Sequence, residues 1–338
     1  MDVIVIGAGV AGVAAAVAAR MSGADVVIIE RSAHVGGVAV SGHHRTLCGL
    51  SPIDAKTPDL IEPEATDWWI PRITTGAPFK RGRVWLWPTS PERLANGLLS
   101  ALNEVRIPLL TSSMPTIHPD GTVMVGDQRW RPAAVIDASG GACGIDGAPA
   151  LSQRPAIQWG SWRADLDLAL PDTIATRRTI LRCIAHLSPG IACEWIRTDR
   201  WQVSLDTDGD HACATALMAE AARVLGATVA RQIDNVAQRD HGGHAGIGLD
   251  ELFSCTNRGL AWAAWPSEIH DAHGIHWRWP ASDRHGCPPS LVKPLHAPSW
   301  MWCCGKGLAA APEAAAALRV IGTGLALGHA VGTLVTSP

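Results

Sequence analysis

The chain has no tyrosine and only two phenylalanines, although 15 of its 338 residues are tryptophan. Without a phenol side chain, no tyrosine hydroxyl can act as an acid, a base or a hydrogen-bond donor. Any proton transfer by this protein must therefore use His, Asp, Glu, Lys, Ser, Thr or Cys side chains.

Charged residues are also scarce, at 17% against 47% hydrophobic residues, and the formal net charge is -3. The absence of a charge excess argues against a nucleic-acid-binding protein and against a disordered, highly charged tail. The length allows one large domain or two interleaved domains. The composition is therefore typical of a compact enzyme that acts on a small-molecule substrate.

Signals for export, membrane insertion and metal binding are lacking too. The nine cysteines form no CxxC pair, and no secretory signal precedes the first predicted strand, so we expect buried thiols in a reducing, cytoplasmic compartment. The apolar stretch 308–335 is interrupted by proline, charged residues and glycines, which argues against a membrane span. We also predict no metal site. A metal needs convergent ligands, and in the histidine-rich patch only His270 and His273, with Asp271, could supply part of a set; the patch comprises His241, His244, His270, His273 and His276.

The first thirty residues have the pattern of a strand, a helix and a second strand. Residues 2–6 form a β-branched run, residues 10–20 are rich in Ala and Val, and residues 25–29 are again apolar. Later α/β elements are a helix over 91–104 capped by Ser90, strands over 105–110, 122–125, 133–138 and 300–304, and a final helix beginning near Gly322 to Gly324. Between the last two strands, residues 214–225 predict another helix.

These elements predict an α/β domain made of three separated segments. The segments are 1–49, 90–149 and 300–338, and the composition between them shifts toward Trp, His, Arg and Pro with weak periodicity. We therefore expect residues 50–89 and 150–299 to form an inserted, mixed α+β substrate or cap region.

The first predicted strand ends in a GxGxxG motif made of Gly7, Ala8, Gly9, Val10, Ala11 and Gly12. The motif stands between a strand and a helix, which is the context that a dinucleotide site requires. The first glycine allows the tight turn, the second lets the backbone approach a pyrophosphate, and the third allows close helix–strand packing. Glu30 ends the second strand, where its carboxylate can bind ribose hydroxyls and disfavours NADP.

Several segments resemble the FAD-dependent oxidoreductases of the two-dinucleotide-binding-domain type, which have a glutathione-reductase-like Rossmann FAD domain. The resemblance rests on Glu30-Arg31 followed by Gly36-Gly37, on 135–140, on Trp265-Pro266-Ser267-Glu268, and on the strand, loop and helix over 300–328 with Arg319-Val320 before the helix. It is dense over 1–50, 133–141 and 260–332. It implies a Rossmann-type FAD-binding domain, and FAD as cofactor.

The resemblance, together with the glycine motif, gives a set of FAD-binding residues. In this family the chain after the second strand passes the flavin, and the last helix points its N-terminus at the flavin pyrimidine ring, where amides or an Arg stabilise negative charge. The expected contacts are Gly7, Gly9, Val10, Ala11, Gly12, Glu30, Arg31, Gly36, Gly37, Val38, Ser139, Gly140, Gly305, Arg319, Val320, Gly322, Thr323 and Gly324.

Two departures from related flavoproteins narrow the reaction. Many flavin hydroxylases carry a Gly-Asp pair where this chain has Gly305-Lys306, which disfavours a typical aromatic hydroxylase. No second GxGxxG is present for NAD(P)H, which disfavours a pyridine-nucleotide reductase with two Rossmann domains.

His43, His44 and Arg45 follow the glycine pair and are expected to approach the flavin. One of them is a candidate base, substrate carboxylate clamp or covalent flavin anchor, and loop packing is the alternative. The tryptophans of the middle region are expected in the core and the pocket wall, which would suit an aromatic or apolar substrate; they are Trp68, Trp69, Trp85, Trp87, Trp159 and Trp162.

The leading hypothesis is transfer of a hydride, or two electrons, between an organic substrate and the flavin N5. One alternative is a flavin-dependent monooxygenase supplied by an external reductase or reductant. The other is a non-catalytic, flavin-bearing subunit of a partner protein.

Overall fold

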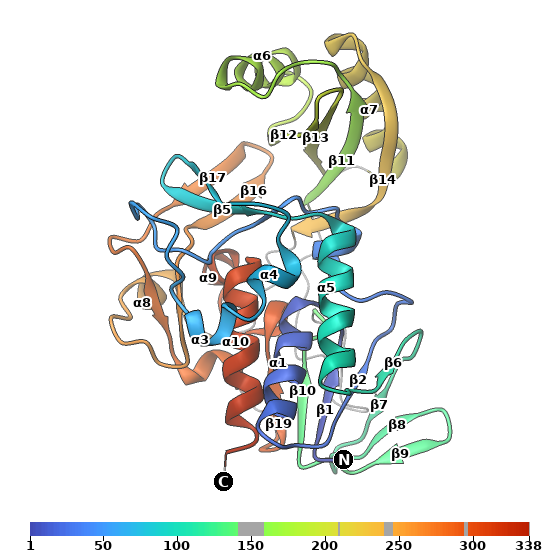
Figure 1. The fold of residues 1–338 in the computed structure, drawn as a ribbon, viewed down its shortest axis with the longest axis vertical. Helices are drawn as coiled ribbons and strands as arrows, with labels where there is room; N and C mark the ends of the chain where they lie inside the picture. The colour runs from blue at the N-terminus through green and yellow to red at the C-terminus, as the bar shows by residue number, and fades with distance from the viewer. Residues whose placement is uncertain (141–158, 209, 240–245, 294–296, 338) are drawn as a thin grey trace.

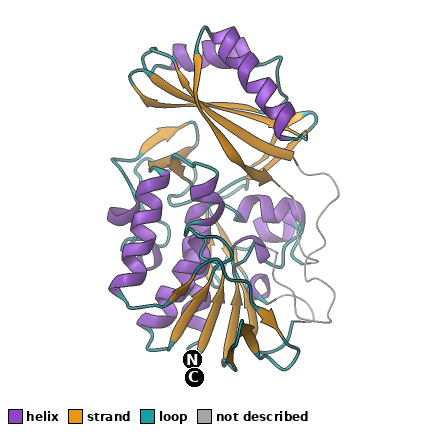
Figure 2. Ribbon diagram, turned by 90° about the vertical axis from the view of Figure 1, so that its right-hand side faces the viewer, coloured by secondary structure: helices purple, strands orange, loops and turns teal. Residues whose placement is uncertain are grey.

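The computed structural model describes residues 1–140, 159–208, 210–239, 246–293 and 297–337 (Figure 1). A larger body contains both termini and a parallel sheet. A smaller unit, here called the cap, lies above it and comprises residues 159–239 as far as they are described (Figure 2).

The body is organised around a five-stranded parallel sheet with the order β19-β10-β1-β2-β6. Its strands are β1 (Val3–Ile6), β2 (Val26–Ile29), β6 (Leu109–Leu110), β10 (Ala134–Asp137) and β19 (Met301–Cys303). Every residue of β1, β2 and β10 is buried, which explains why these strands are continuous apolar runs rather than alternating ones. The chain order reverses between β1 and β10, so a topological switch point lies between these strands.

α1 (Val10–Met21) packs against this sheet, and α10 (Ile321–Leu334) packs against α1 through small residues. The two helices lie so close that a Cβ on Gly328 would stand 2.3 Å from the Ala11 carbonyl oxygen. One turn further, a Cβ on Gly332 would stand 2.1 Å from the Ala15 carbonyl oxygen. The four-residue glycine spacing therefore sets the approach of α10 to α1, and both helices begin at the same edge of the sheet (Figure 1).

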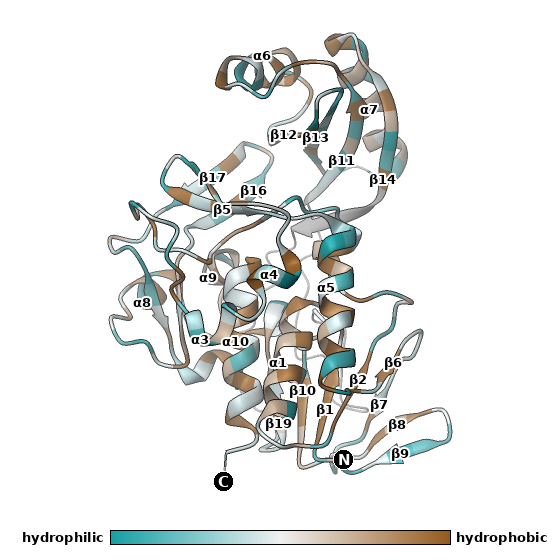
Figure 3. Ribbon diagram, viewed as in Figure 1, coloured by the Kyte–Doolittle hydropathy of each residue, from teal (hydrophilic) through white to brown (hydrophobic). Residues whose placement is uncertain are grey.

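The helix over 91–104 is confirmed as α5 (Pro91–Glu104). The Ser90 hydroxyl oxygen accepts a hydrogen bond from the Arg93 amide at 3.1 Å, and Pro91 occupies the first helical position. Its buried side chains Leu94, Leu98 and Leu102 recur every four residues, and Figure 3 shows hydrophilic positions on its outer face.

The strand predicted over 105–110 is wrong in its first half. Val105 is the C-cap of α5, and Arg106 has a φ of 57°, which is incompatible with a strand. Only Leu109–Leu110 pair with β2, after Pro108, whose carbonyl oxygen accepts from the Ile28 amide. The apolar residues of this segment resembled a strand because Val105 and Ile107 pack on the core from a helix terminus and a turn.

The other predicted elements are confirmed, with boundaries that differ by a few residues. The strand over 122–125 is β8 (Val123–Val125), which lies in a small antiparallel sheet with β7 (Thr116–Ile117) and β9 (Gln128–Trp130). The helix over 214–225 is α7 (His211–Leu225), which begins earlier because the Asp210 side chain caps it through the Cys213 amide.

The remaining short elements surround the parallel sheet. The helices are α2 (Gly37–Ser41), α3 (Pro63–Thr66), α4 (Ile70–Ile73), α8 (Leu249–Phe253) and α9 (Pro312–Leu318), with 3₁₀ turns at Pro289–Val292 and Gly305–Gly307. The strands are β3 (Thr46–Leu47), β4 (Phe79–Arg81), β5 (Val84–Pro88), β15 (Ala261–Ala263), β16 (Ser267–Asp271), β17 (Gly274–Arg278) and β18 (His285–Cys287).

The cap is an antiparallel sheet with helices on one face. Its strand order is β12-β13-β11-β14, and α7 and α6 (Ile174–Ile184) cover it (Figure 2). The strands are β11 (Trp159–Asp167), β12 (Ile191–Arg197), β13 (Arg200–Thr207) and β14 (Thr228–Arg239). The cap has a hydrophobic core of its own around the fully buried Trp201.

The predicted fold class, a Rossmann-type α/β domain with a mixed α+β insertion, is confirmed. The exact limits of the two units, 1–49, 90–149 and 300–338 against 50–89 and 150–299, stay a prediction. In the part of the chain that the structure describes, no single helix is both long and apolar enough to cross a membrane. Helices α9 and α10 pass that test only as a pair, which is bent by 93°.

His285 yields a prediction about stability against pH. It is fully buried in β18, both ring nitrogens lack a hydrogen-bond partner among the described residues, and burial lowers its pKa to about 4. Between pH 6.5 and about 4, His285 is protonated in the unfolded chain but stays neutral in the folded protein. The free energy of unfolding should therefore fall with decreasing pH by up to about 1.4 kcal/mol per unit from this residue.

His285→Leu should reduce that slope, as measured by urea unfolding at pH 4.5, 5.5 and 7. Burial also lowers the pKa of His43 and of His329, so part of the slope should remain in the variant. An unchanged slope in His285→Leu would show that this ring titrates normally in the folded protein.

Candidate functional site

A cavity of about 1220 Å³ opens at the carboxyl ends of the parallel strands. Gly7 after β1, Glu30 after β2, Ser139 after β10 and Gly305 after β19 all line it. This is the edge at which open α/β sheets bind ligands, and the cavity includes the switch point between β1 and β10. Its volume exceeds the range of about 300–1,000 Å³ that is usual for drug-sized ligands, so it can hold a large one.

The three motif glycines have different surroundings. Gly7 has a φ of +103°, and a Cβ there would lie 2.5 Å from the Ala138 carbonyl oxygen, so this turn is closed to other residues. A Cβ on Gly12 would lie 2.1 Å from the Gly7 oxygen, so Gly12 allows α1 to pack on the strand and does not line the cavity. A Cβ on Gly9 would meet no protein atom within 4 Å, and Gly9 lines the cavity.

The N-terminus of α1 therefore faces an open space kept clear by Gly9. The first amides of a helix have no intrahelical partner, and the helix dipole adds positive charge there. Val10 and Ala11 line the cavity beside Gly9. This cradle fits a pyrophosphate, and the residues present therefore fit a dinucleotide cofactor.

Glu30 is positioned by backbone amides. Its Oε2 accepts from the Ala8 amide at 2.6 Å and its Oε1 accepts from the Ser32 amide at 2.8 Å, although the side chain is nearly buried. Each carboxylate oxygen has a second lone pair, so the fixed carboxylate can still accept hydrogen bonds from ribose hydroxyls. Arg31 lies beside it on the cavity wall.

Gly36 and Gly37 lie against the backbone of the turn that precedes α1. Gly36 and Gly37 have φ values of 99° and 51°, and the Gly36 amide donates to the Ala8 carbonyl oxygen at 2.7 Å. A Cβ on Gly37 would lie 3.2 Å from the Gly9 Cα, so the two backbones approach closely. Both glycines and Val38 line the cavity.

The far wall comes from the end of the chain and from the turn after β10. It contains Ser139, Gly140, Gly305, Lys306, Arg319, Val320 and Gly324. Three predicted contacts, Gly12 among them, are absent from the described lining. Gly322 packs on the Gly49 backbone, where a Cβ would stand 2.4 Å from the Gly49 oxygen, and Thr323 is fully buried.

Of the three predicted catalytic residues, only His43 lines the cavity. Its Nε2 lies 3.2 Å from Nη2 of Arg231, a residue of β14 that lines the cavity from the cap. Burial and the Arg231 charge lower the pKa of His43 below its usual 6.5, so the ring is neutral at pH 7. Nε2 accepts from the guanidinium in this state, which leaves the ring hydrogen on Nδ1.

His44 and Arg45 do not line the cavity among the described residues. Arg45 forms an ion pair at 3.6 Å with Asp165 of β11, so it joins the body to the cap. Their approach to the flavin stays a prediction.

The tryptophans do not form the described cavity wall, contrary to expectation. Trp69 is buried in the main core and Trp162 in the cap core. No tryptophan is found among the cavity's described lining, and the side chain of Trp159 lies outside the described residues. The rings of Trp69 and Trp162 therefore stabilise the two cores.

Sequence reasoning missed several cavity residues, of which Arg231 is the most informative. Others are Glu92, Asn96, Ser113 and Met114. Arg231 is 188 positions from His43 and lies on a cap strand with no recognisable motif, so no local pattern pointed to it. For Asn96, the periodicity of α5 predicted which helix face is buried but did not indicate that this residue lines a cavity.

Metal ligands do not gather in the part of the chain that the structure describes. There, no group of three or more His, Cys, Asp or Glu could hold a metal ion, and His241 and His244 lie outside the described residues.

Comparisons with known proteins agree with this geometry. Residues 2–143 match the model of the family described as FAD dependent oxidoreductase. A search of curated proteins found no match.

Among solved structures, the chain is similar to a geranylgeranyl bacteriochlorophyll reductase-like protein from Thermoplasma acidophilum. The identity is 12%, the TM-score is 0.54, and 99% of this chain and 77% of that one are covered. AlpK matches with 13% identity and a TM-score of 0.50 over 97% of this chain and 59% of that one. These two likenesses show the fold.

A third structure, 2-methyl-3-hydroxypyridine-5-carboxylic acid oxygenase, matches with 14% identity and a TM-score of 0.44. The match covers 66% of this chain and 65% of that one, so this chain spans just under two thirds of that protein.

Gly9 and Gly12 give a matched pair of variants. Gly9→Ala should fold with an unchanged melting temperature and bind FAD at least 10-fold more weakly, because the new methyl group enters the cavity and meets no protein atom. Gly12→Ala should lower the melting temperature of the ligand-free protein, because its methyl group collides with the Gly7 carbonyl. Thermal unfolding and fluorescence titration with FAD measure both effects. Equal loss of stability in the two variants would contradict the assignment of Gly9 to the cofactor.

Proposed function

We propose that this protein, whose residues 2–143 match the model of the FAD-dependent oxidoreductase family, binds FAD and transfers a hydride between an organic anion and the flavin N5. The flavin supplies a two-electron acceptor or donor. The observation that carries the proposal is the pairing of His43 and Arg231 in the same cavity as the motif glycines. The glutathione-reductase-like subtype stays a prediction.

The chain's own residues divide the binding of the cofactor among the strand ends. The α1 amides behind Gly9 would hold the diphosphate, and the Glu30 carboxylate would hold a ribose. Arg319 would supply positive charge from the far wall. The same wall also contains Lys306, in the place where many flavin hydroxylases have an Asp.

His43 is the residue that we assign as base. A neutral imidazole can take a proton from a substrate hydroxyl or amine as the hydride leaves the adjacent carbon. In the substrate-free state the Nε2 lone pair accepts from Arg231. A bound anion would draw the Arg231 guanidinium to itself and release that lone pair, so substrate binding and base activation are coupled.

The substrate class follows from charge. Arg231 has no carboxylate partner among the described residues, and its side chain is exposed toward the cavity. Unpaired guanidinium groups bind carboxylates and phosphates through two parallel hydrogen bonds. We therefore favour a small substrate with a carboxylate or a similar anion over a purely aromatic or apolar one.

The reaction is tested by anaerobic mixing of the FAD-loaded protein with a panel of 2-hydroxy and 2-amino acids and their amides. We expect the flavin absorbance to bleach with acids and at least 10-fold less with amides, because Arg231 binds only the anion. Bleaching by NAD(P)H, followed by oxygen uptake that depends on substrate, would instead establish the monooxygenase. A flavin that no substrate or pyridine nucleotide reduces, in a protein that co-purifies with a partner, would establish the subunit role.

Variants of His43 and Arg231 distinguish the role of the base from that of the residue that binds the substrate anion. His43→Asn should slow flavin reduction by about 100-fold or more with FAD binding retained. Arg231→Gln should raise KM for the acid. It should also raise the pKa of His43, because it removes a charge that lowers it, so the acid limb of the rate profile should move to higher pH. Arg197→Gln, which removes an exposed ion pair of the cap, is the control. An acid limb that is unmoved in Arg231→Gln would refute the coupling of the two residues.

A further inference from the structure

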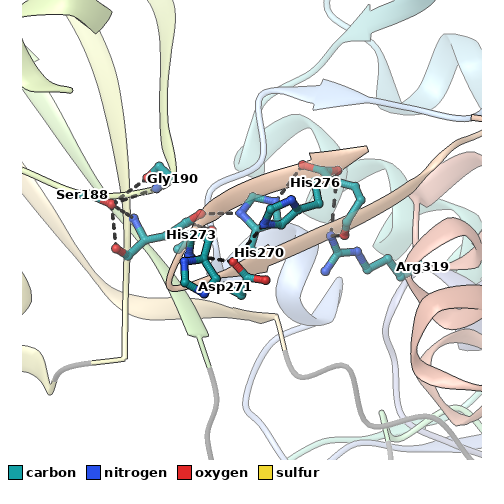
Figure 4. Close-up of polar contacts among 10 residues, drawn as sticks. Ser188, Gly190, His270, Asp271, His273, His276 and Arg319 are labelled. Atoms are coloured by element: carbon teal, nitrogen blue, oxygen red, sulfur yellow. Dashed lines mark hydrogen bonds and ion pairs between the residues drawn. The ribbon is translucent and has the colours of Figure 1, made fainter. Parts of the chain in front are cut away.

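A series of charged side chains, of which His270 and Asp206 are buried and Arg319 and Glu268 are partly buried, connects the wall of the FAD cavity to the cap (Figure 4). It runs from Arg319 to Glu268, then to His270, and ends at Asp206. We propose that His270 is a positioning residue: as a doubly protonated ring it balances Glu268 behind Arg319, and it holds Asp206 of the cap in place. The proposal rests on the proposed function only in that Arg319 faces bound FAD.

His270 lies on β16, in the hairpin between the body and the cap, and its side chain is only 2% exposed. Its Nδ1 faces Oδ2 of Asp206 in a short contact, and its Nε2 lies 2.8 Å from Oε1 of Glu268. Carboxylate oxygens only accept hydrogen bonds, so each ring nitrogen must carry a hydrogen when both carboxyl groups are ionised. The geometry therefore calls for an imidazolium.

In that state the cationic His270 and Arg319 lie against the anionic Glu268 and Asp206. An uncompensated buried charge is strongly destabilising, whereas a hydrogen-bonded pair is tolerated. Among the residues that the structure describes, the hydroxyls of Ser161 on β11 and of Ser188 before β12 also face this cluster.

At the cavity end, this series of side chains fixes Arg319. Its Nη2 donates to the Glu268 carbonyl oxygen at 2.8 Å and lies 3.8 Å from Oε2 of the same residue. Arg319 stands between α9 and α10 and lines the FAD cavity. The net electrostatic potential that Arg319 and Glu268 exert at the cavity therefore depends on the charge that His270 places beside Glu268.

At the cap end, the structure is shaped around Asp206. The Ser161 hydroxyl donates to Oδ1 in a short contact, and the Ser188 hydroxyl oxygen accepts from the Asp206 amide at 3.0 Å. A Cβ on Gly190 would stand 2.0 Å from Oδ2, so only glycine leaves room for the carboxylate. The hairpin tip is equally close, since a Cβ on Gly274 would stand 3.1 Å from the Pro189 oxygen. The backbone around Asp206 therefore accommodates this carboxylate closely.

Two variants should move the reduction potential of bound FAD in opposite directions. His270→Gln removes a positive charge beside Glu268, so reduced, anionic flavin should bind about 10-fold more weakly relative to oxidised flavin, which lowers the midpoint by about 30 mV. Glu268→Gln removes a negative charge behind Arg319, and the midpoint should rise by a similar amount. His276→Gln is the control, because it removes an exposed ion pair with Asp271 on the same hairpin and should change nothing.

A second measurement needs no cofactor. In ¹⁵N spectra of the ligand-free protein at pH 7.5, one histidine should show both ring nitrogens protonated, and this signal should be absent from His270→Gln. If the protein binds no FAD, the proposed function fails while this spectrum still tests His270. A singly protonated His270 would overturn the imidazolium, and shifts of equal sign in His270→Gln and Glu268→Gln, or no shift, would overturn its positioning of charge at the cavity.

Discussion

The site depends on how closely the first helix approaches the sheet. Gly12 of α1 packs against the Gly7 carbonyl, and Gly7 packs against the Ala138 backbone just after β10. Neither position has room for a Cβ. These contacts place the α1 N-terminus at the switch point of the parallel sheet. The glycines of α10 then extend the same close packing to the last helix, which directs its own N-terminus to the same edge. Substituents at these positions would move both helix ends away from the cavity.

Polar contacts join the cap to the body, and the cap core around Trp201 is separate from the main core. Among the described residues, Arg45 pairs with Asp165 and His270 contacts Asp206 across the junction. Buried ion pairs contribute little net stability, but losing one partner is costly, so they favour one arrangement over others. That property matters here, because Arg231 reaches His43 only if the cap holds its place over the cavity.

The sequence predicted the parts of the protein that local patterns determine. The βαβ unit, the GxGxxG turn, Glu30 and the last helix could be placed because glycine and acidic residues at fixed spacing have one physical use. The site residues supplied by the cap could not, since Arg231 meets His43 across 188 positions and neither residue stands in a motif. Val105 and Ile107 were misjudged for a related reason: apolar residues around a helix end are buried as well as those of a strand.

The backbone at His43 gives an independent reason to regard that residue as functional. His43 has a φ of 50°, in the left-handed region that costs a non-glycine residue about 1 kcal/mol or more. The conformation is held by its surroundings: its amide donates to the Val40 carbonyl at the end of α2, and the neighbouring Gly42 carbonyl accepts from Arg163 of the cap. A glycine would relieve the strain but remove the imidazole. The left-handed turn at His43 therefore directs the ring into the cavity, against the preference of the chain.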